Sequence, residues 1–268
     1  MIDSPYLIKP GSKVNLHKFK TDDTGEFKDK QDAQDPIARN LEKLEKLQDV
    51  LYAEAKRSLL IVFQALDAGG KDGAIEHVFS GVNPQGCAVT SFKVPTDIQL
   101  AHDYLWRVHE VVPPKRMIGI FNRSHYESVL VERVKKLVPK DVWKKRYDQI
   151  NNFEKMLSDE GVVIIKFFLH ISKGEQKKRF EQRLKDPRKN WKFDPSDLEV
   201  RKCWDDYMEA YRDAIERCST EYGPWYVVPS DHKWFRNWVI SDTIVRLLSK
   251  LHMHYPPPVP GIEKYKVE

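Results

Sequence analysis

Residues 67–73 read Asp-Ala-Gly-Gly-Lys-Asp-Gly and follow an unbroken apolar run at residues 59–63. Consecutive glycines let backbone N–H groups approach an anion without a Cβ in the way, and the start of a following helix adds partial positive charge. Lys71 supplies a full positive charge on a flexible side chain. The pattern predicts a phosphate loop (residues 67–73) between a buried strand and a helix. The residues that we expect to contact phosphate here are Ala68, Gly69, Gly70, Lys71, Asp72 and Gly73.

The phosphate loop departs at two positions from the common pattern Gly-x-x-x-x-Gly-Lys-Ser/Thr. Ala65 stands where the first glycine belongs, and Asp72 replaces the hydroxyl residue that usually holds magnesium. A glycine-rich turn with an incidental lysine is therefore the structural alternative for this stretch taken alone.

A second polar cluster follows another apolar run, which ends at Phe121. Asn122 and Arg123 come directly after it, and Glu127 stands a few residues later. A strand followed by an acid resembles the arrangement with which phosphate-loop enzymes hold magnesium and position reactants. The planar guanidinium of Arg123 suits a phosphate group, and Asn122 can orient it or bond a substrate oxygen. The alternative is a helix-surface ion pair between Arg123 and Glu127.

A third candidate is the strongly basic segment at residues 172–195. Such a run is most often a solvated helix face, and contact with nucleic acid is the next interpretation. The segment has no recognised nucleic-acid motif and few aromatic rings for stacking on bases. After a strand of a phosphate-loop fold, it predicts instead a lid (residues 172–195) that closes over phosphates and excludes water. The lid residues expected to bring charge to the phosphates are Arg183, Arg188 and Lys189.

Hydrophobic periodicity predicts the elements that position these groups. The expected strands are residues 59–63, 88–92, 117–121, 162–169 and 225–228. Helical patterns separate them, among them a leucine-striped helix opened by Asp35 and Pro36, which packs in the core or against a second subunit, and a final helix capped by Ser230. One helix is expected to be capped by Thr96 or Asp97 and to stop at Pro113 and Pro114. Alternating strands and helices predict an α/β fold of three layers, with a five-stranded parallel sheet covered by helices on both faces.

A chain of 268 residues can form one domain of ordinary to large size, which we expect to span residues 1–268. Ligands of such sheets bind at the carboxyl ends of the strands, where the first two polar clusters both fall. The other expected divisions are an extended, unpacked N-terminal arm (residues 1–34), the lid and a C-terminal tail (residues 255–268).

Composition narrows the class of protein. Lysine and arginine total 45 against 40 for aspartate and glutamate, so the overall charge says less than its distribution. Cys87, Cys203 and Cys218 are widely spaced, which disfavours a disulfide framework and a zinc site. The chain shows neither a signal-peptide pattern nor an apolar stretch of membrane-spanning length. We expect a cytoplasmic protein that binds neither membranes nor nucleic acid.

Taken in this order, the three features resemble the polyphosphate kinase 2 family of phosphate-loop phosphotransferases over about residues 36–250. The phosphate loop looks like the variant Walker A loop of that family, which accounts for both departures from the common pattern. Residues 121–127 are similar to its Walker B counterpart. Further matches are residues 105–107, and residues 191–193 with Asp197 and Trp204 behind them.

The resemblance implies a fold like that of thymidylate kinase, with a helical lid. It also implies transfer of phosphoryl groups between inorganic polyphosphate and adenine or other purine nucleotides, with Mg²⁺ or alternatively Mn²⁺, by a homodimer or homotetramer. Glu127 after Ser-His-Tyr looks like the subgroup that accepts both AMP and ADP. Ser128 departs from the acid common at that position in the subgroup, which leaves the preference between AMP and ADP open.

The resulting hypothesis is an in-line transfer in which the protein contributes position and charge compensation. Asp67 would hold the metal in place of the missing hydroxyl, and Asp72 would share that task. Glu127 and Asn122 would orient the acceptor phosphate or a second metal. The candidate catalytic residues are Asp67, Lys71, Arg123 and Glu127. The rival functions are an ATP-dependent nucleotide or small-molecule kinase on the same fold and, more remotely, a nucleic-acid-binding protein.

Overall fold

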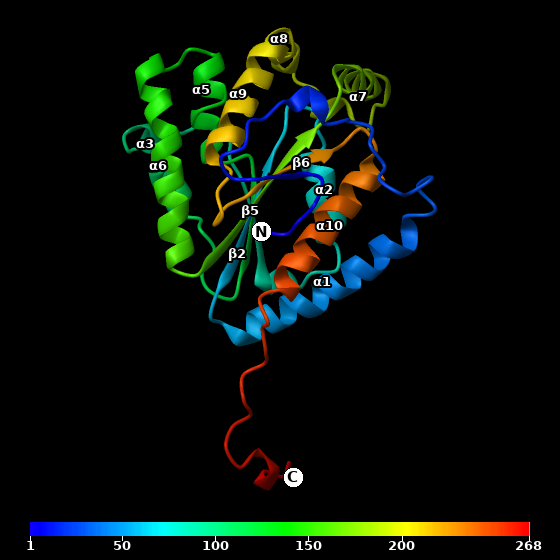
Figure 1. Ribbon diagram of the computed structural model, residues 1–268, viewed down its shortest axis with the longest axis vertical. Helices are drawn as coiled ribbons and strands as arrows, with labels where there is room; N and C mark the ends of the chain where they lie inside the picture. The colour runs from blue at the N-terminus through cyan, green and yellow to red at the C-terminus, as the bar shows by residue number, and fades with distance from the viewer. Residues whose placement is uncertain (268) are drawn as a thin grey trace.

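In the computed structural model, which describes residues 1–267, six strands form one sheet in the order β1-β6-β5-β2-β4-β3 (Figure 1). The strands are β1 (Leu7–Ile8), β2 (Ser58–Gln64), β3 (Cys87–Ser91), β4 (Ile118–Asn122), β5 (Val162–His170) and β6 (Trp225–Pro229). β2 to β6 run parallel, and β1 is antiparallel to β6. The predicted three-layer α/β fold is confirmed, with one strand more than the five expected.

β2 is the central strand, and all seven of its residues are buried. It lies between β5 and β4, and its alternate side chains enter two separate cores. Leu60 and Val62 belong to one core, while Leu59, Ile61 and Phe63 belong to the other. An apolar residue at every position is therefore required, because helices cover both faces of the sheet.

One core lies beneath α1 (Gln34–Glu54), α2 (Lys71–Val78) and α10 (Lys233–Ser249). The other lies beneath α6 (Lys140–Asp159) and α9 (Trp204–Cys218), with α5 (Val131–Val134) packed beside them (Figure 1). The leucine stripe of α1 enters the first core, where Leu44 and Leu51 are buried against α10. That stripe therefore packs within the chain.

Two expected helices differ from the structure, and both differences have a local cause. The helix expected between Thr96 and Pro113 begins at its predicted cap Thr96 but is divided into α3 (Asp97–Leu100) and α4 (Trp106–His109). Between them, the carboxylate of Asp103 accepts a hydrogen bond from the backbone of Leu105, a turn that competes with helix. α10 begins at Lys233 after His232, and Ser230 does not cap it: the Ser230 hydroxyl donates to the carbonyl oxygen of Val228, and no side chain caps the helix.

The N-terminal arm is packed, so the prediction of an extended, unpacked segment was wrong. Ile2, Tyr6 and Ile8 are all buried, and β1 covers the edge of β6. The backbone of Ile2 exchanges hydrogen bonds with the Tyr226 hydroxyl, over 2.9 and 2.8 Å. An exposed strand edge is available for such pairing, and its location cannot be read from the polar composition of the arm.

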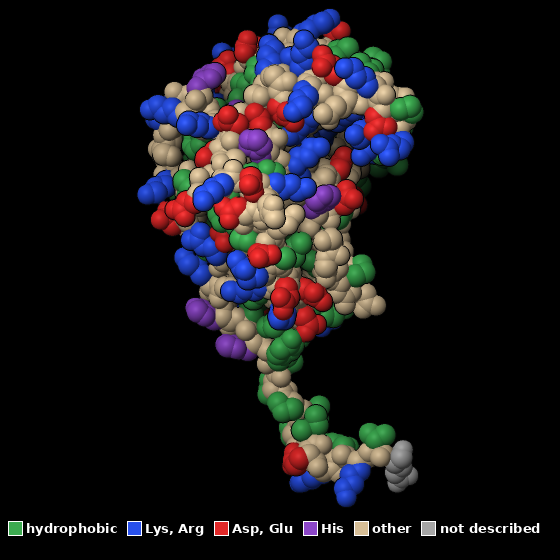
Figure 2. All heavy atoms as spheres, turned by 90° about the vertical axis from the view of Figure 1, so that its right-hand side faces the viewer, with side chains coloured by type: hydrophobic (Ala, Val, Ile, Leu, Met, Phe, Trp, Pro, Cys, Tyr) green, Lys and Arg blue, Asp and Glu red, His purple; other side chains and the backbone are tan. Residues whose placement is uncertain are grey.

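The remaining helices lie near the carboxyl ends of the strands. The lid consists of α7 (Lys173–Lys185), a short 3-10 turn at Asn190–Lys192 and the segment leading to α8 (Ser196–Lys202). Lysine and arginine side chains gather at this upper end of the molecule (Figure 2). The C-terminal tail leaves the body after α10 and ends in a 3-10 turn at Ile262–Lys264 (Figures 1 and 2).

All three cysteines are free thiols, as their spacing predicts. No helix within residues 1–267 is both long enough and apolar enough to cross a bilayer.

Replacing Ile2 with alanine tests the packing of the N-terminal arm. Because the side chain is fully buried, we expect the free energy of unfolding to fall by about 2–5 kcal/mol, measured by urea denaturation. The matched control is Ile262→Ala in the C-terminal tail, where the side chain is 54% exposed and the expected change is below about 0.5 kcal/mol. Equal, small effects of both variants would show that the arm is not packed.

Candidate functional site

The phosphate loop turns sharply between β2 and α2, and two of its positions require glycine. Gly70 has φ +96°, and a Cβ there would lie 2.3 Å from Nη1 of Arg236. At Gly69 a Cβ would lie 2.4 Å from the Cβ of Ala65. Ala68 also has a positive φ of 60°, which is unusual for a residue with a Cβ. The loop is therefore compressed against its surroundings.

Side-chain donors hold the carbonyl oxygens around the phosphate loop. The pairs are Lys71 Nζ with Ala65 O (3.0 Å), Gln176 Nε2 with Asp67 O (2.9 Å), Arg179 Nη1 with Ala68 O (2.9 Å) and Arg236 Nη1 with Gly70 O (3.0 Å). Gln176 and Arg179 come from α7, and Arg236 comes from α10. Carbonyl oxygens would repel an anion, so bonding them to donors removes an obstacle to phosphate binding.

The N–H groups of the same loop remain available. Within the described residues, the backbone N–H groups of Gly70, Lys71, Asp72 and Gly73 have no hydrogen-bond acceptor. They belong to the first turn of α2, where the helix dipole is also positive. Free N–H groups at a helix start form an anion-binding site, as the glycines predict.

Asn122 and Arg123 lie beside this loop because β2 and β4 are paired in parallel. Nη2 of Arg123 donates to Oδ1 of Asp67 over 2.8 Å, and Nδ2 of Asn122 donates to Oδ1 of Asp72 over 2.6 Å. The first two predicted clusters are thus brought together. Arg123 pairs with Asp67, and Glu127 lies in the 3-10 helix η3 (His125–Ser128), so the alternative of a helix-surface pair does not describe the site.

Glu127 is partly buried next to these charges. Burial raises the pKa of its carboxyl group, although the positive charges of Arg123 and Lys71 oppose that shift. Burial and the charge of Arg123 lower the pKa of Lys71, while Asp67, Glu127 and Asp72 act in the opposite direction. Two cations and three carboxylates therefore influence one another across the site, and an added phosphate group would favour the charged form of Lys71.

A fully buried ion pair supports η3 from beneath. Nζ of Lys166, on β5, pairs with Glu154 of α6 and donates to the Tyr126 hydroxyl over 2.9 Å. Glu154 also bonds to the Tyr126 hydroxyl and to Nε2 of His125. Burial acts to raise the pKa of Glu154, but Lys166 and His125 outweigh it and the pKa is lowered. These contacts fix the two residues that precede Glu127.

The lid and the end of β4 enclose a cleft of about 660 Å³ above the phosphate loop. Of the predicted lid residues, Arg183 and Lys189 line this cleft. Arg188 is 89% exposed and pairs with Asp186, outside the lining of the cleft. The site therefore brings together every predicted residue of the phosphate loop with Asn122 and Arg123. Glu127 does not line the cleft, but its charge acts on that of Arg123.

Arg183 also neutralises an acid of the lid. Its Nη1 donates to Oδ2 of Asp197 over 3.1 Å. Burial and the nearby charge of Asp67 raise the pKa of Asp197 to about 6, while Arg183 opposes that rise. Below this pH the carboxyl group is protonated, so the cleft becomes more positive as the pH falls.

Four residues of the site were not singled out from the sequence: Gln176, Arg179, Lys233 and Arg236. Gln176 and Arg179 lie within the basic lid segment, where nothing distinguishes them from solvated neighbours. Lys233 and Arg236 follow β6, and the carboxyl end of a parallel strand is a position where functional residues are expected. The sequence therefore offered a reason to consider Lys233 and Arg236, namely their position after a predicted strand.

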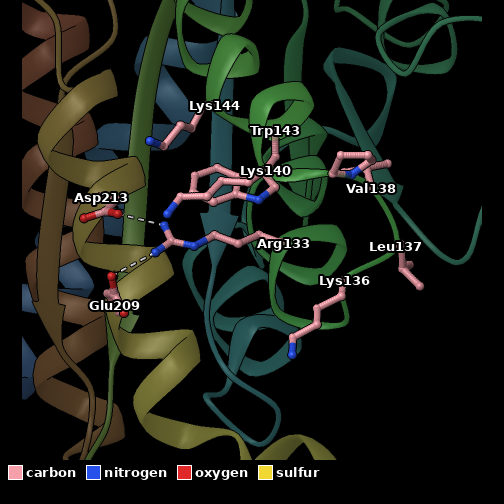
Figure 3. A pocket seen from close by; sticks show the side chains of 10 residues that line it. Arg133, Lys136, Leu137, Val138, Lys140, Trp143, Lys144, Glu209 and Asp213 are labelled. Carbon is pink, nitrogen blue, oxygen red and sulfur yellow. Dashed lines mark hydrogen bonds and ion pairs between the residues drawn. The ribbon is translucent and has the colours of Figure 1, made fainter.

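Another cavity, of about 780 Å³, lies elsewhere, between α5, α6 and α9. Figure 3 shows Arg133 reaching across it to Asp213 and Glu209, at 2.8 and 3.1 Å, with the ring of Trp143 beside the guanidinium. Arg133 is satisfied by these groups and fastens α5 to α9. The charged residues that line this cavity therefore have a structural role.

Asp67 and Asp72 are suited to a magnesium ion. Within residues 1–267, no three His, Cys, Asp or Glu side chains are grouped as a complete metal site. Mg²⁺ usually takes only one or two carboxylates and completes its shell with water and substrate phosphates. Two aspartates beside a phosphate loop match that requirement, and both now accept hydrogen bonds that a cation could replace.

Lys166→Met tests the buried ion pair. It leaves Glu154 charged and buried without its partner, so we expect the free energy of unfolding to fall by about 3–5 kcal/mol in urea denaturation. The double variant Glu154→Gln, Lys166→Met removes both charges and should recover a large part of that loss. Equal losses in the single and double variants would contradict the assigned role of charge.

Gly70→Ala tests the compression of the phosphate loop. The positive φ and the contact with Arg236 predict a loss of about 1–3 kcal/mol in the free energy of unfolding. In the control Gly174→Ala, on α7, the nearest atom to the new Cβ lies 3.8 Å away, and we expect a gain of about 0.5–1 kcal/mol. A Gly70→Ala protein as stable as the control would show that the loop relaxes freely.

The chain is similar to proteins of one family. A model of the family described as "Polyphosphate kinase 2 (PPK2)" matches residues 27–256. A relative from Meiothermus ruber named "AMP/ADP-polyphosphate phosphotransferase" is 54% identical over 264 residues, which cover 98% of this chain and 99% of the relative. An "ADP-polyphosphate phosphotransferase" from Rhodopseudomonas palustris is 44% identical over 97% of this chain and 94% of its own length.

A solved structure is also similar. The crystal structure of Polyphosphate Kinase 2 from Arthrobacter aurescens TC1 superposes with a TM-score of 0.92 at 39% identity, covering 95% of this chain and 92% of that one.

Proposed function

The chain belongs to the polyphosphate kinase 2 family, and we propose on that basis that it transfers phosphoryl groups between inorganic polyphosphate and adenine nucleotides. It would form ADP from AMP and ATP from ADP. The observation that carries this proposal is the cleft in which free N–H groups of the phosphate loop face Arg123 and the basic residues of the lid. Such a cleft suits a substrate with many negative charges.

The residues divide the work of an in-line transfer. The N–H groups of the phosphate loop and Lys71 would bind phosphoryl oxygens and hold the donor in place. Arg123 would compensate the charge on the group in transfer, since its guanidinium lies between the loop and the end of β4. Gln176 and Arg179 would act as positioning residues, because they hold carbonyl oxygens and leave the N–H groups free.

Magnesium, or alternatively manganese, would be held by Asp67 with Asp72, and the ion would neutralise charge on the phosphates. Asp67 is the better placed of the two, because Arg123 already fixes its carboxylate beside the loop.

Glu127 and Asn122 would orient the acceptor. The charges of Arg123 and Lys71 act on Glu127, so its carboxylate can help to orient the guanidinium relative to an acceptor phosphate. We assign acceptance of both AMP and ADP on the resemblance of this segment to the subgroup, and the relative from Meiothermus ruber carries a name of that kind. A homodimer or homotetramer in the cytoplasm is part of the same proposal.

Incubation of the protein with polyphosphate, Mg²⁺ and either AMP or ADP tests this function. We expect ADP and then ATP to accumulate from AMP without any other phosphoryl donor. An ATP-dependent kinase would form neither product from polyphosphate. The order in which the products appear in a time course gives the preference between the two acceptors.

Lys71→Ala tests the role of the phosphate loop in the same assay. The loss of one contact to the transferring phosphates should lower the turnover rate by about 100- to 1,000-fold. The control is Lys43→Ala on the exposed side of α1, which should react at the normal rate. Near-normal turnover of Lys71→Ala would refute the assigned role.

A further inference from the structure

One wall of the cleft carries buried positive charge. Arg236 of α10 is 2% exposed and Arg179 of α7 is 6% exposed, and both line the cleft. Both guanidinium groups meet at Gly70, where a Cβ would lie 2.3 Å from Nη1 of Arg236 and 3.4 Å from Nη1 of Arg179. Like charges this close repel each other, and burial strengthens the repulsion.

The two arginines differ in their partners. Arg179 bonds to the carboxylate of Glu175 at 2.8 Å and to carbonyl oxygens of Ala68 and Ser230. Arg236 bonds only to neutral acceptors among the described residues, namely Gly70 O and Oδ1 of Asn237. Three of its N–H groups are used in these bonds, out of the five that a guanidinium carries. Two donors and a full charge are therefore left over.

Asp231, the acidic residue nearest to Arg236 in the sequence, binds other groups. The carboxylate of Asp231 accepts hydrogen bonds from the backbone of Ser172 and from the hydroxyl of Thr21. Lys233, on the same turn of α10 as Arg236, is exposed and forms no ion pair within residues 1–267. Partial burial and the charges of Arg179 and Arg236 lower the pKa of Lys233, and burial with the charge of Arg179 lowers the pKa of Arg236 to about 9.

The start of α2 adds to this excess of positive charge. The Arg236 guanidinium lies against Gly70, directly before the first turn of α2, where the helix dipole is positive. A buried cation without a counter-charge costs stability, and proteins retain such costs mainly where a ligand removes them. A phosphate group in the cleft would supply the missing acceptors and the missing negative charge together.

We propose that Arg236 and Lys233 bind a phosphate group of a phosphoanhydride chain, next to the group that the phosphate loop holds. Arg179 is the positioning residue of this subsite, because its carboxylate and carbonyl partners fix it against the same loop. The proposal rests on the proposed function for the nature of the ligand. Either inorganic polyphosphate or the phosphates of a nucleotide could supply this chemistry, and the experiment separates these sources.

The test compares Arg236→Met and Lys233→Gln with two matched controls. Arg246→Met changes an arginine on the same helix that is 48% exposed and pairs with Asp242, and Lys43→Gln changes an exposed lysine of α1. The melting temperature of each protein is measured alone, with sodium tripolyphosphate and with ADP. Ligands that bind the folded state raise this temperature, and at a fixed concentration the rise grows with the logarithm of their affinity.

We expect Arg236→Met to melt at or above the wild-type temperature without ligand, because an uncompensated charge is removed. Its rise in melting temperature with tripolyphosphate should be less than half that of the wild type, while its rise with ADP is retained. Lys233→Gln should fold normally and lose a smaller part of the tripolyphosphate response. Both controls should respond as the wild type does. If the subsite holds nucleotide phosphates instead, the ADP response is the one that is lost.

Kinetics separate binding from structure. We expect Arg236→Met to raise KM for polyphosphate at least tenfold and to change KM for the nucleotide less than twofold. The proposal is overturned if both variants keep the full responses to tripolyphosphate and to ADP, or if Arg236→Met melts lower with unchanged KM values, which would make Arg236 purely structural. A wild-type protein that responds to tripolyphosphate but forms no ATP would refute the proposed function and leave the subsite intact.

Discussion

The site depends on the register of two parallel strands. Phe63 of β2 lies beside Asn122 of β4, and the backbone N–H of Arg123 donates to the carbonyl oxygen of Phe63 over 3.0 Å. This pairing brings the phosphate loop and the end of β4 to the same edge of the sheet. A shift of β4 by one residue would turn Arg123 toward the opposite face, away from Asp67. The contacts of Arg123 with Asp67 and of Asn122 with Asp72 depend on this alignment.

Buried charge serves two different purposes around that edge. The pair of Lys166 and Glu154 is closed, because each charge has its partner and the remaining donors are satisfied by neighbouring groups. It supports η3 and needs no ligand. Arg236 has no counter-charge, because its acceptors are neutral, and two of its donors are unused. The pair of Lys166 and Glu154 makes the framework rigid, whereas Arg236 retains affinity for an anion. Stability and binding thus depend on different buried charges.

The sequence predicted those parts of the site whose residues are close together in the chain. The phosphate loop and Arg123 follow apolar strands directly, and their strand ends meet in any parallel sheet of this order. Arg236 and Lys166 were missed because their roles arise from packing between distant elements: the first reaches Gly70 from α10, and the second finds Glu154 across β5 and α6. The N-terminal arm was misjudged for the same reason, since its partner strand lies at the other end of the chain.

The pairing of the first and last strands also affects the order in which the protein can fold. Ile2 bonds to Tyr226 across 224 positions of sequence, and β1 has its partner only in β6. On the ribosome, the first strand is made long before that partner, so this edge of the sheet closes only after β6 has been made. Contacts of such high sequence separation slow folding. The apolar residues of β1 therefore lack their partner strand until β6 has been made, and closure of this edge is a late step in folding.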